Sequence, residues 1–474
     1  MFKNLTKQEK AWVLYDVGNS AFTMLACSLI PIWFKSLAIG DAPGQITGDQ
    51  ATAYYSIAIA VVTVIVALLG PVLGAIADHK DTKKIFFTTA VSLGVIGCII
   101  NGFATSWVLF IVIYILAKIF YQASLTFYDS MLNDVTTEDR MDQVSSYGYA
   151  WGYIGSCIPF LVALGAYILG PDMLGKISGR LSMIIGFTVT GLWWFLVTMP
   201  LIKNYKQVNY VETEKGAVAK AFRNLGGTLK KIAKEKKILF FLIAFFLYID
   251  GVGTIIDNCI NIGTDLGLNT VGQVVFLLAT QVVAWIGSLV FARLSKKYQT
   301  VPLILVCIVG YFCVCIYALF LSTIWHFGIL AFGVGCFQGS IQSLSRSYYS
   351  KIIPPENSGE YFGIYDIFAK GASFLGSAVI AWVKLAGGTI NIAVALLSIF
   401  FALGFLMALE ISLSSMPSMY ALRKMNTRSL YTELIVVCPF PAISPTITFI
   451  TLGSSVLISS IPMYLNTYFS MLYL

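Results

Sequence analysis

Residues 51–84 read ATAYYSIAIAVVTVIVALLGPVLGAIADHKDTKK, and this stretch indicates what kind of protein the chain is. Residues 51–77 hold no charged side chain, and Asp78 then opens a polar loop that contains three lysines. An α-helix needs about 20 apolar residues to cross the ~30 Å hydrocarbon core of a bilayer. The stretch is therefore typical of a membrane-spanning helix that ends where the chain enters water.

The composition extends this interpretation to the whole chain. Of the 474 residues, 58% are hydrophobic and only 11% are charged, whereas soluble domains carry roughly 25% charged residues. The net charge of +8 fits the cytoplasmic loops of a membrane protein, so we do not expect nucleic-acid binding. We predict an all-α membrane protein with twelve spans, at residues 11–37, 51–77, 85–104, 107–131, 145–169, 181–202, 238–262, 271–295, 300–321, 324–347, 361–383 and 389–413.

The basic residues predict the topology. If the N-terminus is inside, the outer side has few basic residues, and those on the inner side include Lys80, Lys83, Lys84, Arg140, Arg293, Lys296, Lys297 and Lys351. Lys and Arg collect in the cytoplasmic loops of membrane proteins. We therefore predict a multi-pass protein of the cell (inner) membrane with a cytoplasmic N-terminus.

A long polar stretch divides the predicted spans into two sets of six. It covers residues 203–237 and separates two predicted six-helix bundles, at residues 1–202 and 238–413. Within it, residues 218–237 fit either an amphipathic helix on the membrane surface or a basic interdomain linker. The tail, residues 414–474, has an apolar segment that is long enough for an additional span, and we assign it no function.

The two sets of spans also resemble each other in sequence. Tyr15 and Asp16 in the first span have counterparts in Tyr248 and Asp250 in the seventh. Two similar halves of six spans joined by a cytoplasmic linker are the parallel-repeat plan of facilitator transporters. The span count and the placement of the loops support this plan more strongly than the weak repeat does.

Ionisable side chains inside the spans are the strongest functional signal. Each costs at least ~2.5 kcal/mol at the bilayer centre on the insertion scale, so each needs a reason to be there. They share helix faces with other polar residues, chiefly in the first, fourth, seventh, tenth and eleventh spans. A lone Ser or Gln in such a stripe is more often a contact that holds helices together. We predict a substrate site that contains Lys118, Gln122, Asp250, Thr254, Gln338, Gln342 and Lys370.

Two charges of opposite sign fall near the middle of the membrane. At ~1.5 Å rise per residue, Lys118 lies ~16 Å from the outer end of its span and Asp250 ~18 Å from the inner end of its own. We hypothesise that the two pair in the empty site, or hold the carboxylate and the ammonium group of a zwitterion. Asp250 and Asp257 are the proton-coupling candidates, because burial and a nearby lysine shift a carboxyl pKa in opposite directions.

Three further charges predict a gate. Asp16, Asp129 and Arg346 fall toward the cytoplasmic ends of the first, fourth and tenth spans. A salt bridge between the two halves at this level would close the inner side. The alternative is that these side chains extend separately to the membrane interface.

Motifs for catalysis or metal binding are absent from the sequence. It contains no HExxH, no GxSxG and no Walker element, and its nine cysteines are scattered without a CxxC pair. We therefore expect a transporter rather than an enzyme, with no metal and no cofactor. The expected partners are a small-molecule substrate, protons and membrane lipid, and we expect a monomer.

Several motifs are similar to those of one family. Residues 74–84 (GAIADHKDTKK) resemble the loop between spans two and three of the major facilitator superfamily. The segments that resemble the branch named for the autophagy-related vacuolar amino-acid effluxer are 12–22 (WVLYDVGNSAF), 248–255 (YIDGVGTI), 339–347 (GSIQSLSRS) and 360–366 (EYFGIYD). The resemblance covers about residues 8–410.

The resemblance carries expectations about function. It implies a major facilitator fold, a gating role for Asp78 as a latch on the inner side, and efflux of small molecules such as amino acids. A proton-coupled secondary transporter of small polar solutes is thus the leading hypothesis. A transporter of lipids or amphiphiles is the alternative, because 14% aromatic residues would suit an apolar cavity. A channel or a membrane-embedded enzyme is less favoured.

Overall fold

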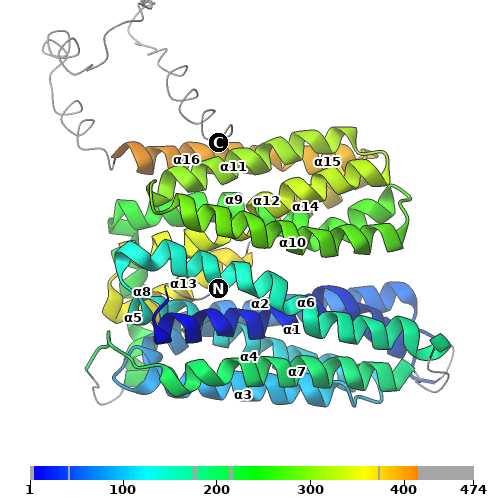
Figure 1. The fold of residues 1–474 in the computed structure, drawn as a ribbon, viewed down its shortest axis with the longest axis horizontal. Helices are drawn as coiled ribbons and strands as arrows, with labels where there is room; N and C mark the ends of the chain where they lie inside the picture. The colour runs from blue at the N-terminus through cyan, green and yellow to red at the C-terminus, as the bar shows by residue number, and fades with distance from the viewer. Residues whose placement is uncertain (1–4, 41–42, 174–178, 213–216, 372–373, 415–474) are drawn as a thin grey trace, which may run out of the picture. The chain divides into compact units, whose positions relative to one another are not determined.

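The computed structural model of the chain describes residues 5–40, 43–173, 179–212, 217–371 and 374–414. By their contacts, Met1–Ile411 form one compact unit. The additional span predicted in the tail lies outside the described residues. Figure 1 shows the long helices of the unit running alongside one another.

The first six predicted spans are confirmed as long helices. In chain order these are α1 (Lys7–Ala38), α2 (Gly48–Ala77), α3 (Thr82–Asn101), α4 (Trp107–Ser130), α6 (Met141–Met173) and α7 (Gly179–Asn204). Short helices α5 (Leu132–Val135) and η1 (Glu138–Arg140) connect α4 to α6. The ends of several helices extend beyond the predicted spans, because they continue as polar turns past the apolar core.

The last six spans follow an additional helix, α8 (Ala217–Lys234). They comprise α9 (Lys236–Asp265), α10 (Thr270–Leu294), α11 (Thr300–Tyr317), α12 (Ile324–Ile352), α13 (Ser358–Gly371) with α14 (Phe374–Leu385), and α15 (Ile390–Leu396) with α16 (Ser398–Ser414). Short turns η2 (Ala318–Phe320) and η3 (Pro355–Asn357) flank α12. In the described part of the chain, eleven helices are long and apolar enough to cross a membrane. The eleventh predicted span is formed by two helices, α13 and α14.

Local sequence explains where several helices begin. Thr6 and Thr47 each form a capping box, with Glu9 and Gln50 respectively. A Ser, Thr or Asn side chain likewise caps α4, α10, α12 and α15. Such caps satisfy backbone N–H groups that have no partner inside the helix.

One hydrogen bond occurs in equivalent positions of the two halves. The Tyr15 hydroxyl of α1 is 2.6 Å from the Ser124 hydroxyl of α4. The Tyr248 hydroxyl of α9 is 2.6 Å from the Ser345 hydroxyl of α12. These are the first and fourth spans of each half, so the structure carries the internal repeat that the sequence suggests only weakly.

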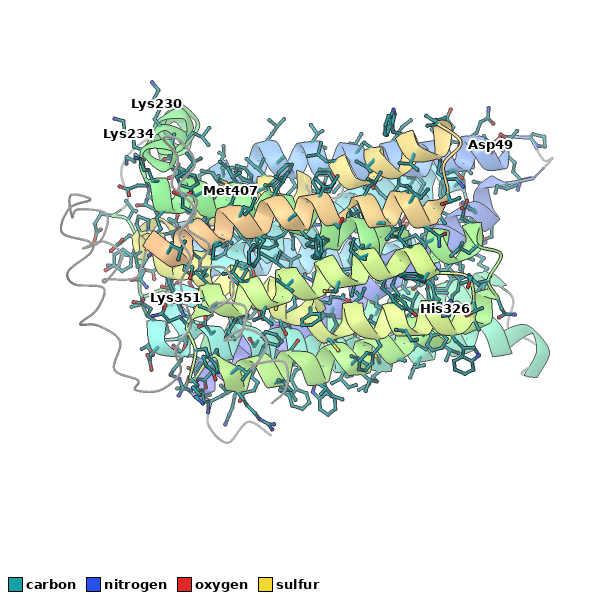
Figure 2. All side chains as sticks on the ribbon, turned by 90° about the horizontal axis from the view of Figure 1, so that it is seen from above. Asp49, Lys230, Lys234, His326, Lys351 and Met407 are labelled. Carbon is teal, nitrogen blue, oxygen red and sulfur yellow. The ribbon has the colours of Figure 1, made fainter. Side chains whose placement is uncertain are left out.

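Basic residues gather at one end of the unit. Figure 2 shows Lys230, Lys234 and Lys351 at this end, and Asp49 and His326 at the other. We call the lysine-rich end the inner end, because the predicted topology places it in the cytoplasm. The predicted amphipathic segment in the linker is helical there, as α8, and it packs against α2 and α9.

Candidate transport site and inner gate

Arg346 joins the two halves at the inner end. Its guanidinium lies 3.2 Å from the Asp16 carboxylate of α1 and 3.0 Å from the Asp129 carboxylate of α4. It also donates to the Ser145 hydroxyl at 3.0 Å and to the Ser145 carbonyl at 3.1 Å. The structure thus brings together the three charges that the sequence analysis assigned to a gate. Their function in gating stays a prediction.

Aromatic rings enclose this ion-pair cluster. The Arg346 guanidinium stands 4.6 Å from the centre of the Trp12 ring and 4.5 Å from that of Tyr149. Only 3% of the Arg346 side chain is exposed, which excludes separate extension to the membrane interface. Breaking a buried ion pair by removing one partner costs ~3–5 kcal/mol, because the remaining charge is left without compensation.

Asp78 forms a second contact between the halves. Its carboxylate, at the end of α2, accepts the backbone N–H groups of Gly359 at 2.8 Å and Glu360 at 2.9 Å. These are the first N–H groups of α13, and a negative charge is favourable at a helix N-terminus. We call this contact the α2–α13 latch.

Lys83 completes the latch. Its fully buried ammonium is 3.2 Å from the Asp78 carboxylate and donates to the Ser358 hydroxyl at 2.9 Å. Burial raises the pKa of the Asp78 carboxyl above its ordinary value, and the Lys83 ammonium and the two α13 amides oppose that rise. A Cβ atom on Gly359 would lie 2.5 Å from the Gly74 carbonyl oxygen, so the two helices meet backbone to backbone.

Asp142, at the start of α6, makes a third contact between the halves. Its carboxylate is 2.7 Å from the Lys351 ammonium and accepts the hydroxyls of Ser347 at 2.6 Å and Thr300 at 2.8 Å. All three partners come from the second half of the chain. These three contacts join the halves at the inner end together with other hydrogen bonds, such as the one that the Asn133 amide donates to the Ser350 carbonyl at 3.2 Å.

The outer part of α2 is largely exposed. Ile57, Val64 and Leu68 each expose more than half of their surface, whereas the residues from Gly70 to Val72 are buried. Among the described residues, α2 packs along α13 but makes no comparable contact with α14. Within the described part of the chain, the eleventh span thus packs on the second mainly through α13, its inner part.

Asp250 caps the outer part of the eleventh span. Its fully buried carboxylate accepts the N–H of Leu375 at 3.1 Å and of Gly376 at 2.7 Å, in the first turn of α14. Thr254, one turn further along α9, is also fully buried, and its hydroxyl points at Gly376 without a hydrogen-bond partner. The sequence analysis placed both residues in the substrate site.

Lys118 faces a different set of groups. Its ammonium lies 5.1 Å from the centre of the Tyr121 ring and 5.7 Å from that of Phe22. Among the described contacts, Lys118 meets aromatic rings and Asp250 meets α14, and their pairing stays a prediction. The exposed Cys27 thiol of α1 lies within electrostatic range of both Lys118 and Asp257. Lys118 is half-buried and Asp257 is exposed.

The other predicted site residues take ordinary polar positions. Gln342 is half-buried and donates to the Gln338 carbonyl at 3.1 Å. Gln338 forms a side-chain hydrogen bond with Tyr153 of α6, across the two halves. Gln122 is half-buried on α4. Lys370 belongs to α13, and its side chain lies outside the described residues.

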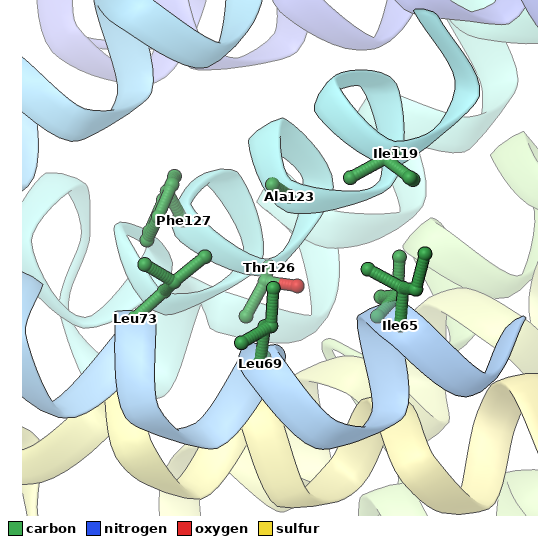
Figure 3. Close-up of a pocket in the computed structure, with 9 residues that line it drawn as sticks. Ile65, Leu69, Leu73, Ile119, Ala123, Thr126 and Phe127 are labelled. Carbon is green, nitrogen blue, oxygen red and sulfur yellow. The ribbon is translucent and has the colours of Figure 1, made fainter. Parts of the chain in front are cut away.

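An apolar crevice lies between α2 and α4, apart from these charges. Figure 3 shows Ile65, Leu69 and Leu73 of α2 opposite side chains of α4. The full lining is Ile65, Val66, Leu69, Gly70, Leu73, Ile119, Ala123, Thr126 and Phe127. No titratable side chain lines it. Among the described residues, no group of His, Cys, Asp and Glu is arranged to hold a metal ion.

Residues 5–416 match the family described as "Vacuole effluxer Atg22 like". The chain belongs to this family. It is 40% identical over 407 residues to an MFS-type transporter, YxiO, of Bacillus subtilis (strain 168), covering 85% of this chain and 94% of that one. It is 26% identical over 302 residues to autophagy-related protein 22-2 of Penicillium rubens, covering 57% of this chain and 49% of that one.

Solved structures place this Atg22-like chain in the major facilitator fold. It resembles the major facilitator transporter FucP in the outward conformation, with a TM-score of 0.64 at 14% identity, over 85% of this chain and 97% of that one. It also resembles the proton:xylose symporter XylE, with a TM-score of 0.60 at 13% identity, over 85% and 94% of the two chains. The chain is thus a multi-pass transporter of the major facilitator type.

Sequence reasoning missed several residues of the inner end of this Atg22-like transporter. Lys83 was used only to predict topology, and Asp142 and Ser145 were not singled out. The only local signal for Lys83 is its place in the polar loop that follows Asp78. Asp142 and Ser145 carry no such signal, because their partners lie about 200 residues away along the chain.

Proposed function

We propose that this Atg22-like protein is a proton-coupled secondary transporter that exports small polar solutes, amino acids among them, by alternating access. The observation that carries the proposal is the set of polar contacts between the halves at the inner end. Arg346 between Asp16 and Asp129, together with the α2–α13 latch, would close the cytoplasmic side. A transporter that alternates must form and break such contacts once in each cycle.

The solute is proposed to bind between Lys118 and Asp257. Lys118 would take the carboxylate of a zwitterion, and Asp257 its ammonium group, because the Cys27 thiol is within electrostatic range of both. This revises the earlier hypothesis, in which Asp250 took the ammonium group. The wall of the site would gain polar groups from Gln122, Thr254, Gln338 and Gln342. Lys370 stays a predicted substrate-binding residue.

Asp250 is proposed to carry the coupled proton. Its ionised carboxylate accepts two amides of α14, and a protonated carboxyl has one acceptor oxygen fewer for them. Protonation would therefore loosen α14 from α9. Export is supported by the family description, which names a vacuole effluxer.

Flux in proteoliposomes tests the proposal. With an acidic interior, we expect uptake of at least one labelled amino acid from a mixed panel, and collapse of the gradient should abolish it. Asp250→Asn should make uptake independent of the gradient, and Lys118→Gln should abolish it. The matched control is Asp265→Asn on the same helix, because Asp265 is exposed and pairs with Lys384 at 2.8 Å near the outer end.

Two other outcomes are informative. Gradient-driven uptake that persists in Asp250→Asn would reject the proton-coupling role while keeping the transport proposal. If folded protein moves no amino acid, the amino-acid class is rejected. The second candidate, a transporter of lipids or amphiphiles, rests on the 14% aromatic residues of the chain, and fluorescent lipids in the same vesicles would test it.

A further inference from the structure

The linker between the two halves is attached to the inner gate at its beginning. The Tyr205 hydroxyl donates to the Asp134 carboxylate at 2.5 Å. The Val211 amide donates to the Asp78 carbonyl at 2.8 Å, and the Lys80 amide donates back to the Val211 carbonyl at 3.2 Å. The start of the linker thus pairs with the loop that carries the latch aspartate.

Helix α8 attaches the linker to the gate a second time. Thr228 and Ile232, one helical turn apart, are both buried where α8 packs against α2 and α9. The Thr228 side chain is hydrogen-bonded to Glu360, and Lys231 lies within electrostatic range of the same carboxylate. Glu360 is also the residue whose backbone N–H is held by Asp78. Helix α8 therefore contacts α13 at the latch itself.

The opposite face of α8 is basic and exposed. Lys230 and Lys234 of α8 are exposed, and so are Lys236 and Lys237 at the start of α9. Glu235 is the only acidic residue among residues 230–237. Leu229 beside them leaves 46% of its surface exposed. Figure 2 shows Lys230 and Lys234 directed away from the bundle. A helix with lysines and an exposed leucine next to a membrane-spanning bundle matches the chemistry of an anionic membrane surface.

We propose that α8 binds anionic lipid headgroups of the cytoplasmic leaflet and thereby holds the inner gate closed. In the closed arrangement Thr228 holds α8 against the latch while Lys230 and Lys234 are exposed. The proposal is that headgroups bind α8 better in this arrangement than when α8 has left the latch. A ligand shifts an equilibrium toward the state that it binds better. Each lysine near an anionic surface contributes about a fivefold preference. This regulation of the gate by lipid goes beyond the proposed transport function and does not depend on which solute is carried.

Hydrogen–deuterium exchange of the full chain in lipid nanodiscs tests this proposal. The measured quantity is the exchange rate of residues 358–366, which contain the two latch amides. We expect slower exchange in discs that contain phosphatidylglycerol than in discs of phosphatidylcholine alone, by up to about fivefold for each lysine that contacts headgroups in the closed state only. Equal exchange in the two kinds of disc would overturn the proposal.

Variants separate the lipid contact from its effect on the gate. The double variant Lys230→Gln/Lys234→Gln should lose the lipid effect. The control Lys296→Gln/Lys297→Gln, which removes two exposed inner lysines after α10, should keep it. Thr228→Val should keep lipid protection of residues 226–234 and lose it at residues 358–366. If both double variants lose the lipid effect equally, the total positive charge of the inner end explains it, and α8 is not the lipid-binding element.

Discussion

Asp78 and Asp250 perform the same local chemistry in two different settings. Each carboxylate accepts two backbone N–H groups from the first turn of a helix in the eleventh span, α13 for Asp78 and α14 for Asp250. Asp78 reaches its helix from α2, in the other half of the chain. Asp250 reaches its helix from α9, in the same half.

Asp78 connects the two halves and Asp250 connects two helices of one half, so we expect the two caps to have different functions. The bonds of Asp78 must break when the halves move apart at the inner end, so they act on the equilibrium between closed and open states. The bonds of Asp250 join α9 and α14 within one half, so separation of the halves does not by itself break them, and only the proposed protonation of Asp250 would loosen them. We therefore propose that capping a helix acts as a latch at Asp78 and supports a discontinuous span at Asp250.

The largest effect is expected from the ion-pair cluster that accompanies the latch. Arg346→Gln leaves the buried Asp16 and the half-buried Asp129 without their guanidinium and should destabilise the closed state by ~3–5 kcal/mol. We expect a clear fall in the thermal unfolding temperature of the purified protein. The control is Arg293→Gln, since Arg293 is exposed at the inner end of α10. Equal shifts for the two variants would show that the cluster does not hold the halves together.

Alanine substitutions at Gly359 and Gly376 compare the two helix caps directly. A Cβ on Gly359 would lie 2.7 Å from the Asp78 carboxylate, and a Cβ on Gly376 would lie 2.9 Å from the Asp250 carboxylate. Each alanine should cost ~1–3 kcal/mol through overpacking. Only Gly359→Ala should speed amide exchange at the inner ends of α6 and α12.

Gly226→Ala is the control for these two variants. Gly226 lies in α8, and a Cβ there would meet no atom within 4 Å, so we expect no loss of stability. If Gly376→Ala opened the inner end as much as Gly359→Ala, the two caps would not differ in function.

The smallest effects are expected from the repeated tyrosines. Tyr15→Phe and Tyr248→Phe each remove one hydrogen bond, at a cost of ~0.5–1.5 kcal/mol. The partner serines stay satisfied, because Ser124 and Ser345 also donate to carbonyl groups of their own helices. Unfolding in denaturant should give similar losses for both variants, and a large difference would argue that the two halves are not equivalent here.

The spans were predictable because the signal for them is local. A run of apolar residues and the placement of lysines indicate each helix and its direction without knowledge of its neighbours. The charges of the gate were found for the same reason, since Asp16, Asp129 and Arg346 are costly wherever they lie in a span. Their pairing is a finding of the structure.

Contacts with backbone groups were not predictable. Asp250 was expected to face Lys118, because both are charged and lie at similar depth. Its described partners are amides of α14, and a backbone N–H leaves no mark in the sequence. The polar partners of Asp142 were missed because they lie in the other half of the chain.

Hydrogen–deuterium exchange of Asp78→Asn and Asp250→Asn tests the central claim most directly. We expect Asp78→Asn to speed exchange at residues 358–366 and also at residues 141–147, the inner end of α6, because the halves separate. Asp250→Asn should speed exchange only within residues 374–385. If Asp250→Asn opened the inner end as Asp78→Asn does, or if Asp78→Asn left it protected, the distinction between latch and support would be wrong.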